Sequence, residues 1–247
     1  ESYADDAIFS WVDNIGQILI EEYQLDINGK TIDKQTGEWL KIWSELTLSQ
    51  TKQKGYNKLT GLFDPVRSTD NPGPLKLLVP LKFWFCKNIG LALPIVTLKN
   101  QDVTLSLKLR PFSECWIKKI DMKGQPDPNI NISAELLIDY IYLDTKERNK
   151  FFKQHHIYLM EQLQFSLNNV YPINKPSLSI PLDKFKHPIK ELIWVVQRQD
   201  VLEQLDDNDY DWDGGNDWFN YTNYRSCYDV TLKQEMFDSA TLIFNGK

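Results

Sequence analysis

The strongest candidate for chemistry in this sequence is an acidic segment with carboxylates at alternate positions, Asp209-Tyr210-Asp211-Trp212-Asp213-Gly214. Alternate carboxylates followed by a glycine match the start of a calcium-binding loop, because their side chains can converge on one hard cation. The twelfth position of such a loop carries a bidentate glutamate, whereas this sequence has Asn220 there. We therefore interpret residues 206–224 as a solvated acidic loop and predict no metal site.

Aromatic residues are dense in and beside this acidic loop, at Trp212, Trp218, Phe219, Tyr221 and Tyr224. Aromatic rings can stack on sugars, and they are also enriched where protein surfaces meet. The favoured interpretation is that these rings pack the loop down or contact a neighbouring subunit. A glycan-binding or glycan-active protein stays open as the alternative function.

The histidines do not form a catalytic or metal-binding pattern. His155 and His156 are adjacent, so their side chains diverge on a helix or a strand, whereas a helical metal site uses an i, i+4 pair. His187 precedes Pro188 in a turn rich in lysine and proline. The chain contains no phosphate-binding loop, dinucleotide-binding glycine motif or nucleophile elbow. We therefore predict no catalytic residues, no cofactor and no enzymatic activity.

Composition and charge narrow the classes of partner. The net charge is −6, and no run of lysine or arginine supplies the basic face that a phosphate backbone requires, so we expect no direct nucleic-acid binding. The longest uncharged apolar stretch, Asn88–Leu98, is too short to cross a bilayer, so we expect no membrane insertion. Cys86, Cys115 and Cys227 are widely spaced and form no CxxC motif, which argues against a disulfide scaffold or a zinc site.

Alternation of apolar and polar residues gives the clearest structural signals. The segment Tyr23–Ile27 alternates strictly, which predicts a half-buried strand. The Asn28-Gly29 pair that follows predicts a tight hairpin turn into a returning strand. Residues Val103–Leu109 alternate in the same way, which places their four apolar side chains on one face.

Further strands are predicted where short apolar runs are bounded by turn signals. Before residue 144 these strands are Leu77–Phe85, Trp116–Ile120 and Ala134–Leu143. After residue 158 they are Leu159–Leu167, Leu178–Pro181, Leu192–Val196, Val230–Leu232 and Ala240–Phe244. Strands dominate and do not alternate regularly with helices, which favours an all-β fold of antiparallel sandwiches over a parallel sheet.

One helical insertion interrupts the strands of the first half. Trp39, Leu40, Trp43 and Leu46 fall at helical spacing, which predicts an amphipathic helix with these side chains on its apolar face. Gly55 is expected to break the helical pattern.

A charged segment divides the chain into two predicted domains. Asp144 can cap a helix, and Glu147 three residues later completes a capping box. We therefore predict a linker helix over residues 145–158 between a first domain, residues 1–144, and the start of a second, residues 159–247. The last predicted strand runs into Asn245-Gly246, a hairpin signal, so we expect the chain to be part of a longer polypeptide.

Four blocks of sequence, in order, resemble those of major capsid proteins of nucleocytoplasmic large DNA viruses. They are Ile32–Trp39 with Trp43–Thr47, Pro80–Cys86 with Asn88–Pro94, Asp139–Asp144 with Glu147 and Arg148, and His187–Gln197. The region after Asp200 resembles the family only loosely.

The resemblance implies a fold of two tandem jelly-roll sandwiches. Residues before Glu1 would supply the initial strands of the first, and most of the second would lie beyond Lys247. It further implies pseudo-hexagonal homotrimers that tile an icosahedral shell, with neighbouring capsomers and minor capsid proteins as partners. The family has no catalytic residues to carry over. The expected location is the virion capsid, assembled in the host cell cytoplasm.

Overall fold

The computed structural model describes residues 9–62, 75–98, 100–118, 131–166, 177–199, 201–202, 215–222 and 236–243. Several predicted features lie outside these residues. They are the acidic repeat 209–214, the strand 230–232, the hairpin signal 245–246, Cys227 and Tyr224.

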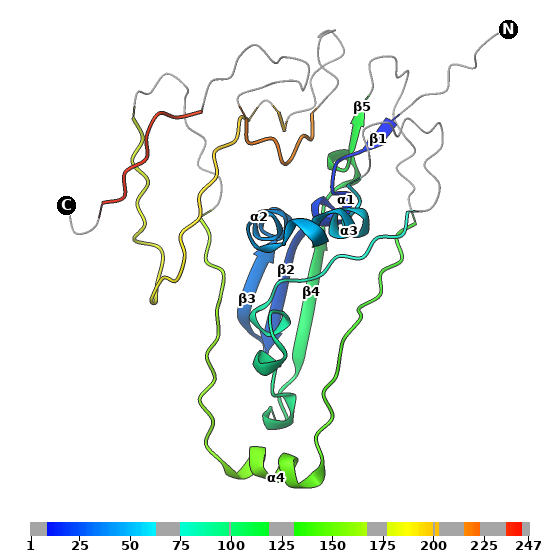
Figure 1. Cartoon of the computed structure of the whole chain (residues 1–247), viewed down its shortest axis with the longest axis vertical. Coiled ribbons are helices and arrows are strands. Elements are labelled where there is room, and N and C mark those ends of the chain that lie inside the picture. The colour runs from blue at the N-terminus through cyan, green and yellow to red at the C-terminus, as the bar shows by residue number, and fades with distance from the viewer. Residues whose placement is uncertain are drawn as a thin grey trace, which may run out of the picture.

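A three-stranded antiparallel sheet forms the centre of the structure (Figure 1). Its strands are β2 (Ile20–Ile27), β3 (Lys30–Thr36) and β4 (Val103–Leu109), in the order β3-β2-β4. A second, two-stranded antiparallel sheet pairs β1 (Phe9–Trp11) with β5 (Trp116–Lys118). The predicted strands at Tyr23–Ile27, Val103–Leu109 and the start of Trp116–Ile120 are therefore confirmed.

The predicted hairpin turn joins β2 to β3. Asn28 and Gly29 have φ angles of 52° and 73°, the positive values that a two-residue turn of type I′ requires. Glycine and asparagine tolerate this left-handed backbone better than other residues do. The turn is held further by a hydrogen bond from the Asn28 N–H to the carbonyl of Asp102, at 2.9 Å.

A β-bulge aligns the buried face of β2. The pairing register with β4 shifts between Ile20 and Glu22, so one additional residue is inserted in β2. Because of this insertion, Ile20 and Tyr23 both face the core although they are three positions apart, and they are 7% and 0% exposed. Leu105 and Leu107 of β4 lie opposite Leu25 and Tyr23, which confirms that they share this face.

Two helices follow the hairpin, α2 (Gly37–Thr47) and α3 (Gln50–Thr60). The Thr36 hydroxyl caps α2 by accepting a hydrogen bond from the Trp39 N–H at 3.3 Å. The buried stripe of α2 consists of Gly37, Leu40 and Ser44, so the predicted apolar face is only partly correct, and Leu46 is 62% exposed. The expected break at Gly55 is wrong, because this glycine lies inside α3.

The N-terminal end of α2 packs directly against the short helix α1 (Ile15–Ile18) and the chain that follows it. A Cβ added at Gly37 would lie 2.1 Å from the carbonyl oxygen of Gln17 and 2.3 Å from that of Ile20. No side chain fits in this space. A glycine is therefore required where α2 begins.

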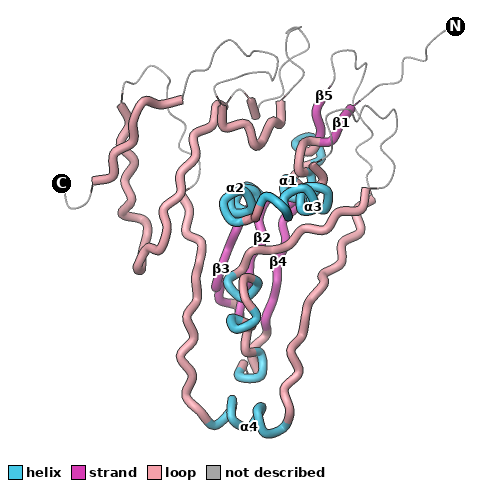
Figure 2. Tube along the Cα trace, viewed as in Figure 1, coloured by secondary structure: helices cyan, strands magenta, loops and turns pink. Residues whose placement is uncertain are grey.

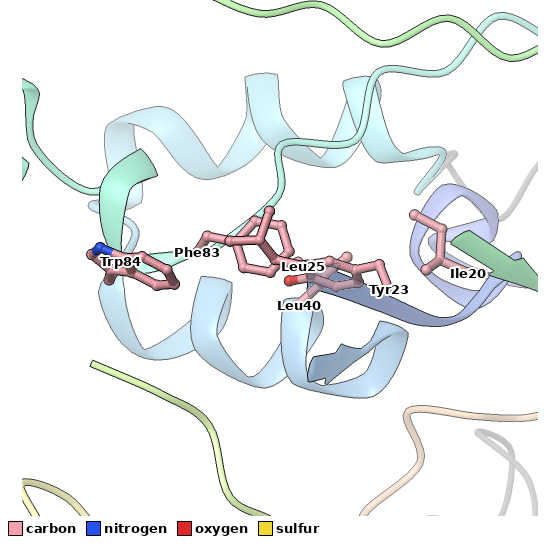
Figure 3. Close-up of a cluster of buried hydrophobic side chains, with 6 residues drawn as sticks. All are labelled: Ile20, Tyr23, Leu25, Leu40, Phe83 and Trp84. Carbon is pink, nitrogen blue, oxygen red and sulfur yellow. The ribbon is translucent and has the colours of Figure 1, made fainter. Parts of the chain in front are cut away.

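The main core lies between the sheet, α2 and residues 77–86, a segment that crosses the sheet (Figure 3). Its buried members are Ile20, Tyr23, Leu25, Leu40, Phe83 and Trp84. The prediction of a strand over Leu77–Phe85 is wrong: residues 75–83 have no assigned strand, and Trp84–Cys86 is a 3-10 turn. Its apolar side chains pack onto the sheet face, which explains the continuous hydrophobic run without strand pairing.

The predicted linker contains helix α4 (Thr145–Lys153). The Asp144 carboxylate accepts a hydrogen bond from the Glu147 N–H at 2.7 Å, which confirms Asp144 as the N-cap. The chain on either side is extended, and we name residues 131–144 the first arm and residues 154–166 the second arm. In Figure 2 the two arms run along either side of the sheet and meet at α4.

The arms and the described residues beyond them contain no assigned strand, contrary to the sequence prediction. The unpaired segments are 134–143, 159–166, 178–181, 192–196 and 240–243. They carry exposed apolar side chains, among them Leu137 at 73%, Tyr142 at 88% and Leu159 at 80%. Alternation and β-propensity predict an extended backbone, but a strand also needs a neighbour for its hydrogen bonds. Among the described residues these segments have no such neighbour.

Candidate functional site: a polar clasp beside the sheet

The described residues contain no group of three or more His, Cys, Asp or Glu side chains that could hold a metal ion. The His156 ring stacks on Phe151, with ring centroids 4.9 Å apart, and its Nε2 lies 2.9 Å from the Phe151 carbonyl oxygen. This histidine therefore packs against the end of α4. Cys115 is 1% exposed, and burial raises the pKa of its thiol to about 11, so it belongs to the core as an unreactive side chain.

No helix in the described part of the chain combines the length and apolar character needed to span a bilayer.

The most elaborate polar arrangement lies where the second arm contacts the sheet. The Tyr23 hydroxyl donates to Gln35 Oε1, and Gln35 Nε2 donates to Asp33 Oδ2 at 2.7 Å. The other oxygen of Asp33 accepts the backbone N–H of Leu163 at 3.1 Å, and Gln162 Nε2 donates to the Ile32 carbonyl. A chain of hydrogen bonds thus runs from the centre of the sheet to the second arm.

A second contact between the core and the arm is made by Tyr158, near the start of the second arm. The indole N–H of Trp84 donates to the Tyr158 hydroxyl at 2.9 Å, and that hydroxyl donates in turn to the Leu91 carbonyl. Trp84 is 1% exposed, so its N–H has no access to water and Tyr158 supplies the acceptor that it needs.

An ionic contact joins a third segment to the arm. Glu161 forms ion pairs with Lys190, at 2.5 Å, and with Lys87. The Lys87 ammonium also lies 4.6 Å from the ring centroid of Trp43 on α2. Hydrogen bonds from Lys190 and Lys87 lower the pKa of the Glu161 carboxyl, so it stays charged near neutral pH. We use the name clasp for all the contacts that residues 158–163 make with these partners.

The electrostatics of the clasp centre on Asp33, which is 2% exposed. Burial raises the pKa of its carboxyl above the ordinary value, whereas hydrogen bonds from Gln35, Leu163 and Lys34 and the charge of Lys87 lower it. Burial has the larger effect, so the pKa of Asp33 is raised overall, and the donors offset only part of the cost of burying this carboxyl. This arrangement can hold two segments together; it offers no nucleophile beside a base.

The clasp brings together sequence blocks that are far apart in the chain. Asp33 belongs to the block Ile32–Trp39, Trp84 and Leu91 to the block Pro80–Pro94, and Lys190 to the block His187–Gln197. The arm itself follows the remaining block, Asp139–Asp144. The sequence blocks can be recognised by their resemblance to the family, but no sequence pattern predicts that Asp33, Lys87 and Glu161 form contacts with distant segments.

A second contact region joins residues 215–222 to the small sheet. Asn216 is 3% exposed, and its Nδ2 donates to the carbonyls of Ser113, at 2.8 Å, and Trp116, at 2.9 Å. The Trp218 indole N–H donates to the Glu114 carbonyl at 2.9 Å, and the Arg110 guanidinium lies 4.0 Å from the Trp218 ring centroid. Trp218 therefore packs this segment down, as the favoured interpretation of the aromatic residues predicts. Trp212 lies outside the described residues.

A cavity of about 230 Å³ lies beside this contact region. Asp13, Lys41, Asp217 and Phe219 are among the residues that line it. Burial raises the pKa of both carboxyls, and the charge of Asp217 raises that of Asp13 further. The Lys41 ammonium lies 5.8 Å from the ring centroid of Phe219. Cations thus lie over the rings of Phe219 and Trp218.

The fold and these contacts define a β-rich protein whose most developed polar arrangement joins segments of the chain. Two family models match consecutive stretches: the model for the major capsid protein N-terminus matches residues 1–144, and the model for the large eukaryotic DNA virus major capsid protein matches residues 147–247. The chain belongs to the family of major capsid proteins of large eukaryotic DNA viruses. The resemblance inferred from the four blocks is confirmed.

Individual relatives carry the same description. The major capsid protein of Phaeocystis pouchetii virus is 35% identical over 80% of this chain and 43% of its own length. The major capsid protein of Pyramimonas orientalis virus is 38% identical over 79% of this chain and 46% of its own. Among solved structures, PBCV-1 VP54 aligns with 67% of this chain and 42% of its own, at 25% identity and a TM-score of 0.49. The chain thus spans less than half the length of these relatives.

Proposed function

We propose that this chain is part of a structural major capsid protein that tiles the icosahedral shell of a large double-stranded DNA virus. The observation that carries the proposal is the match of two capsid family models to adjacent stretches, residues 1–144 and 147–247. The relatives are themselves named major capsid proteins, which supports the same role here. The protein acts through its surfaces, without a catalytic step.

The proposed architecture is a pair of tandem jelly-roll sandwiches. Residues 1–144 contribute to the first, residues 145–158 link the two, and residues 159–247 begin the second. The position of α4, Thr145–Lys153, between the two matched stretches supports this division. The exposed apolar side chains of the arms also support this division. Extended segments of this kind become stable strands once neighbouring parts of the protein cover both of their faces.

The proposed assembly is a homotrimer with a pseudo-hexagonal outline. Two sandwiches in each of three chains give six wedges, so a closed ring with three-fold symmetry can occupy a hexagonal lattice position. Its partners are copies of itself, neighbouring capsomers and minor capsid proteins, in a virion assembled in the host cell cytoplasm. The net charge of −6 suits a shell wall that does not bind the genome directly.

The oligomeric state tests this proposal. The chain is expressed with the sequence that its source gene carries on either side, purified, and measured by native mass spectrometry over a range of concentrations. The proposal predicts a dominant trimer. The major capsid protein of a relative, measured under the same conditions, is the positive control. If that control assembles while this protein stays monomeric at the highest concentration, the proposal is contradicted.

A further inference from the structure

Asp33 lies at the point where the second arm meets the sheet. Its carboxylate is 2% exposed, and both of its oxygens accept hydrogen bonds, from Gln35 Nε2 at 2.7 Å and from the Leu163 N–H at 3.1 Å. The first bond belongs to the sheet and the second to a residue 130 positions later in the chain. The same side chain is therefore part of the core and of the arm contact.

The contacts of the clasp differ in how strongly they can hold the arm. Glu161 and Lys190 have side-chain exposures of 36% and 64%, so water and salt weaken their ion pair. The bond from the Leu163 N–H ends on a carboxyl oxygen of a buried residue, where little water competes for the donor. Loss of this acceptor would leave a backbone donor without its partner.

Two buried anchors are enough to fix the register of an extended segment. Tyr158 is held by the Trp84 indole and the Leu91 carbonyl, and Leu163 is held by Asp33. A shift of the arm by one residue would turn its side chains to the opposite face and break both contacts. The pair of anchors therefore selects one register of the arm on the sheet.

We propose that Asp33 is the positioning residue that fixes the second arm on the sheet and so sets the orientation of the second proposed sandwich relative to the first. The consequence for orientation rests on the proposed function, because it assumes that the arm leads into a second sandwich. The fixing of the arm itself does not. Without this anchor the arm would still be held at Tyr158, but the segment from Leu163 onward would lose its buried contact with the sheet.

Hydrogen–deuterium exchange of the arm amides tests the anchor in the chain itself. Asp33→Ala removes the acceptor of the Leu163 N–H and is expected to accelerate exchange of the Leu163 amide by about ten- to hundredfold, which corresponds to about 1.4–2.8 kcal/mol. Asp33→Asn keeps one carbonyl oxygen for the Leu163 N–H and is expected to retain most of the protection. Asp26→Ala is the matched control, because Asp26 is a carboxylate of the same sheet that accepts hydrogen bonds from Gln24 Nε2 within β2.

A third variant keeps the test decisive if Asp33→Ala fails to fold. Leu163→Pro removes the backbone donor from the arm and leaves the sheet unchanged, so a protease should cut the arm faster while the amides of the β2–β3 hairpin keep their protection from exchange. Unchanged arm exchange in Asp33→Ala, or equal acceleration in Asp26→Ala, overturns the proposal. If Asp33→Ala unfolds the hairpin and Leu163→Pro leaves the arm protected, the proposal is also overturned.

Assembly is measured separately in the same variants, so that the two proposals can fail independently. If the unaltered protein forms trimers and Asp33→Ala forms fewer trimers with a faster-exchanging arm, both stand. If no variant forms trimers but the arm still responds to Asp33→Ala, the anchor stands and the proposed function fails. If trimers form normally in Asp33→Ala despite a faster-exchanging arm, the role of Asp33 in orienting the second sandwich is overturned.

Discussion

Replacement of Tyr158 by phenylalanine removes one hydroxyl group that connects the core to the second arm. The Trp84 indole N–H, in a side chain that is 1% exposed, then loses its acceptor at 2.9 Å. A buried donor left without a partner costs about 1–3 kcal/mol. The Leu91 carbonyl also loses a donor, but this residue is partly exposed, so water can replace that bond. We therefore expect the free energy of unfolding to fall by about 1–3 kcal/mol.

Urea unfolding followed by tryptophan fluorescence measures this loss. The control is Tyr142→Phe, because Tyr142 is 88% exposed and its hydroxyl is hydrated, so its loss should change stability by less than about 0.5 kcal/mol. The double variant Trp84→Phe/Tyr158→Phe should show a coupling of about 0.5–3 kcal/mol between the two sites. Equal midpoints for Tyr158→Phe and Tyr142→Phe would refute the hydrogen-bond network described for the clasp.

The remaining predictions concern the sheet face and the buried carboxyls. Leu25→Asp should prevent folding, because Leu25 is 3% exposed and the change would bury a charge in the core; a circular dichroism spectrum of a folded protein would contradict the assignment of faces. The pKa values of Asp13 and Asp217 are raised above 3.8, so their stabilising contribution is present at low pH and is lost as the pH rises through the raised values. Lowering the pH from 7 toward those values should therefore raise the protection factors of the amides in residues 215–222, which are corrected for the intrinsic pH dependence of exchange. Asp217→Asn should reduce this rise, and lower protection factors on mild acidification would contradict the prediction.

The local parts of the fold could be predicted from the sequence, because short-range rules determine them. The Asn28-Gly29 turn, the alternation of Val103–Leu109 and the Asp144 cap each depend on a few neighbouring residues. The strands that the sequence predicts in the arms are not assigned in the structure. Their residues favour an extended backbone, but pairing depends on segments that the local pattern does not specify.

The clasp could not be predicted from the sequence either, because its contacts join segments that lie far apart in the chain. In β3 the buried positions are Asp33 and Gln35, two polar residues, while the apolar Ile32 between Thr31 and Asp33 is only partly buried. Ile32 packs against the main core from its partly buried position, so hydrophobic pattern alone does not identify Asp33 and Gln35 as the buried residues. The polar pair can occupy buried positions because Tyr23 supplies a donor to Gln35 and Leu163, from a distant segment, supplies one to Asp33. No signal within the strand itself reveals that partner.

The central claim is that this chain forms part of a tandem-sandwich subunit in a three-fold capsid building block. Cryo-electron microscopy of the protein assembled with its flanking sequence measures this directly. The account predicts a closed ring of three chains in which each contributes two adjacent sandwiches, giving six wedges around the axis. A ring with one sandwich per chain, or particles with no three-fold ring, would contradict it.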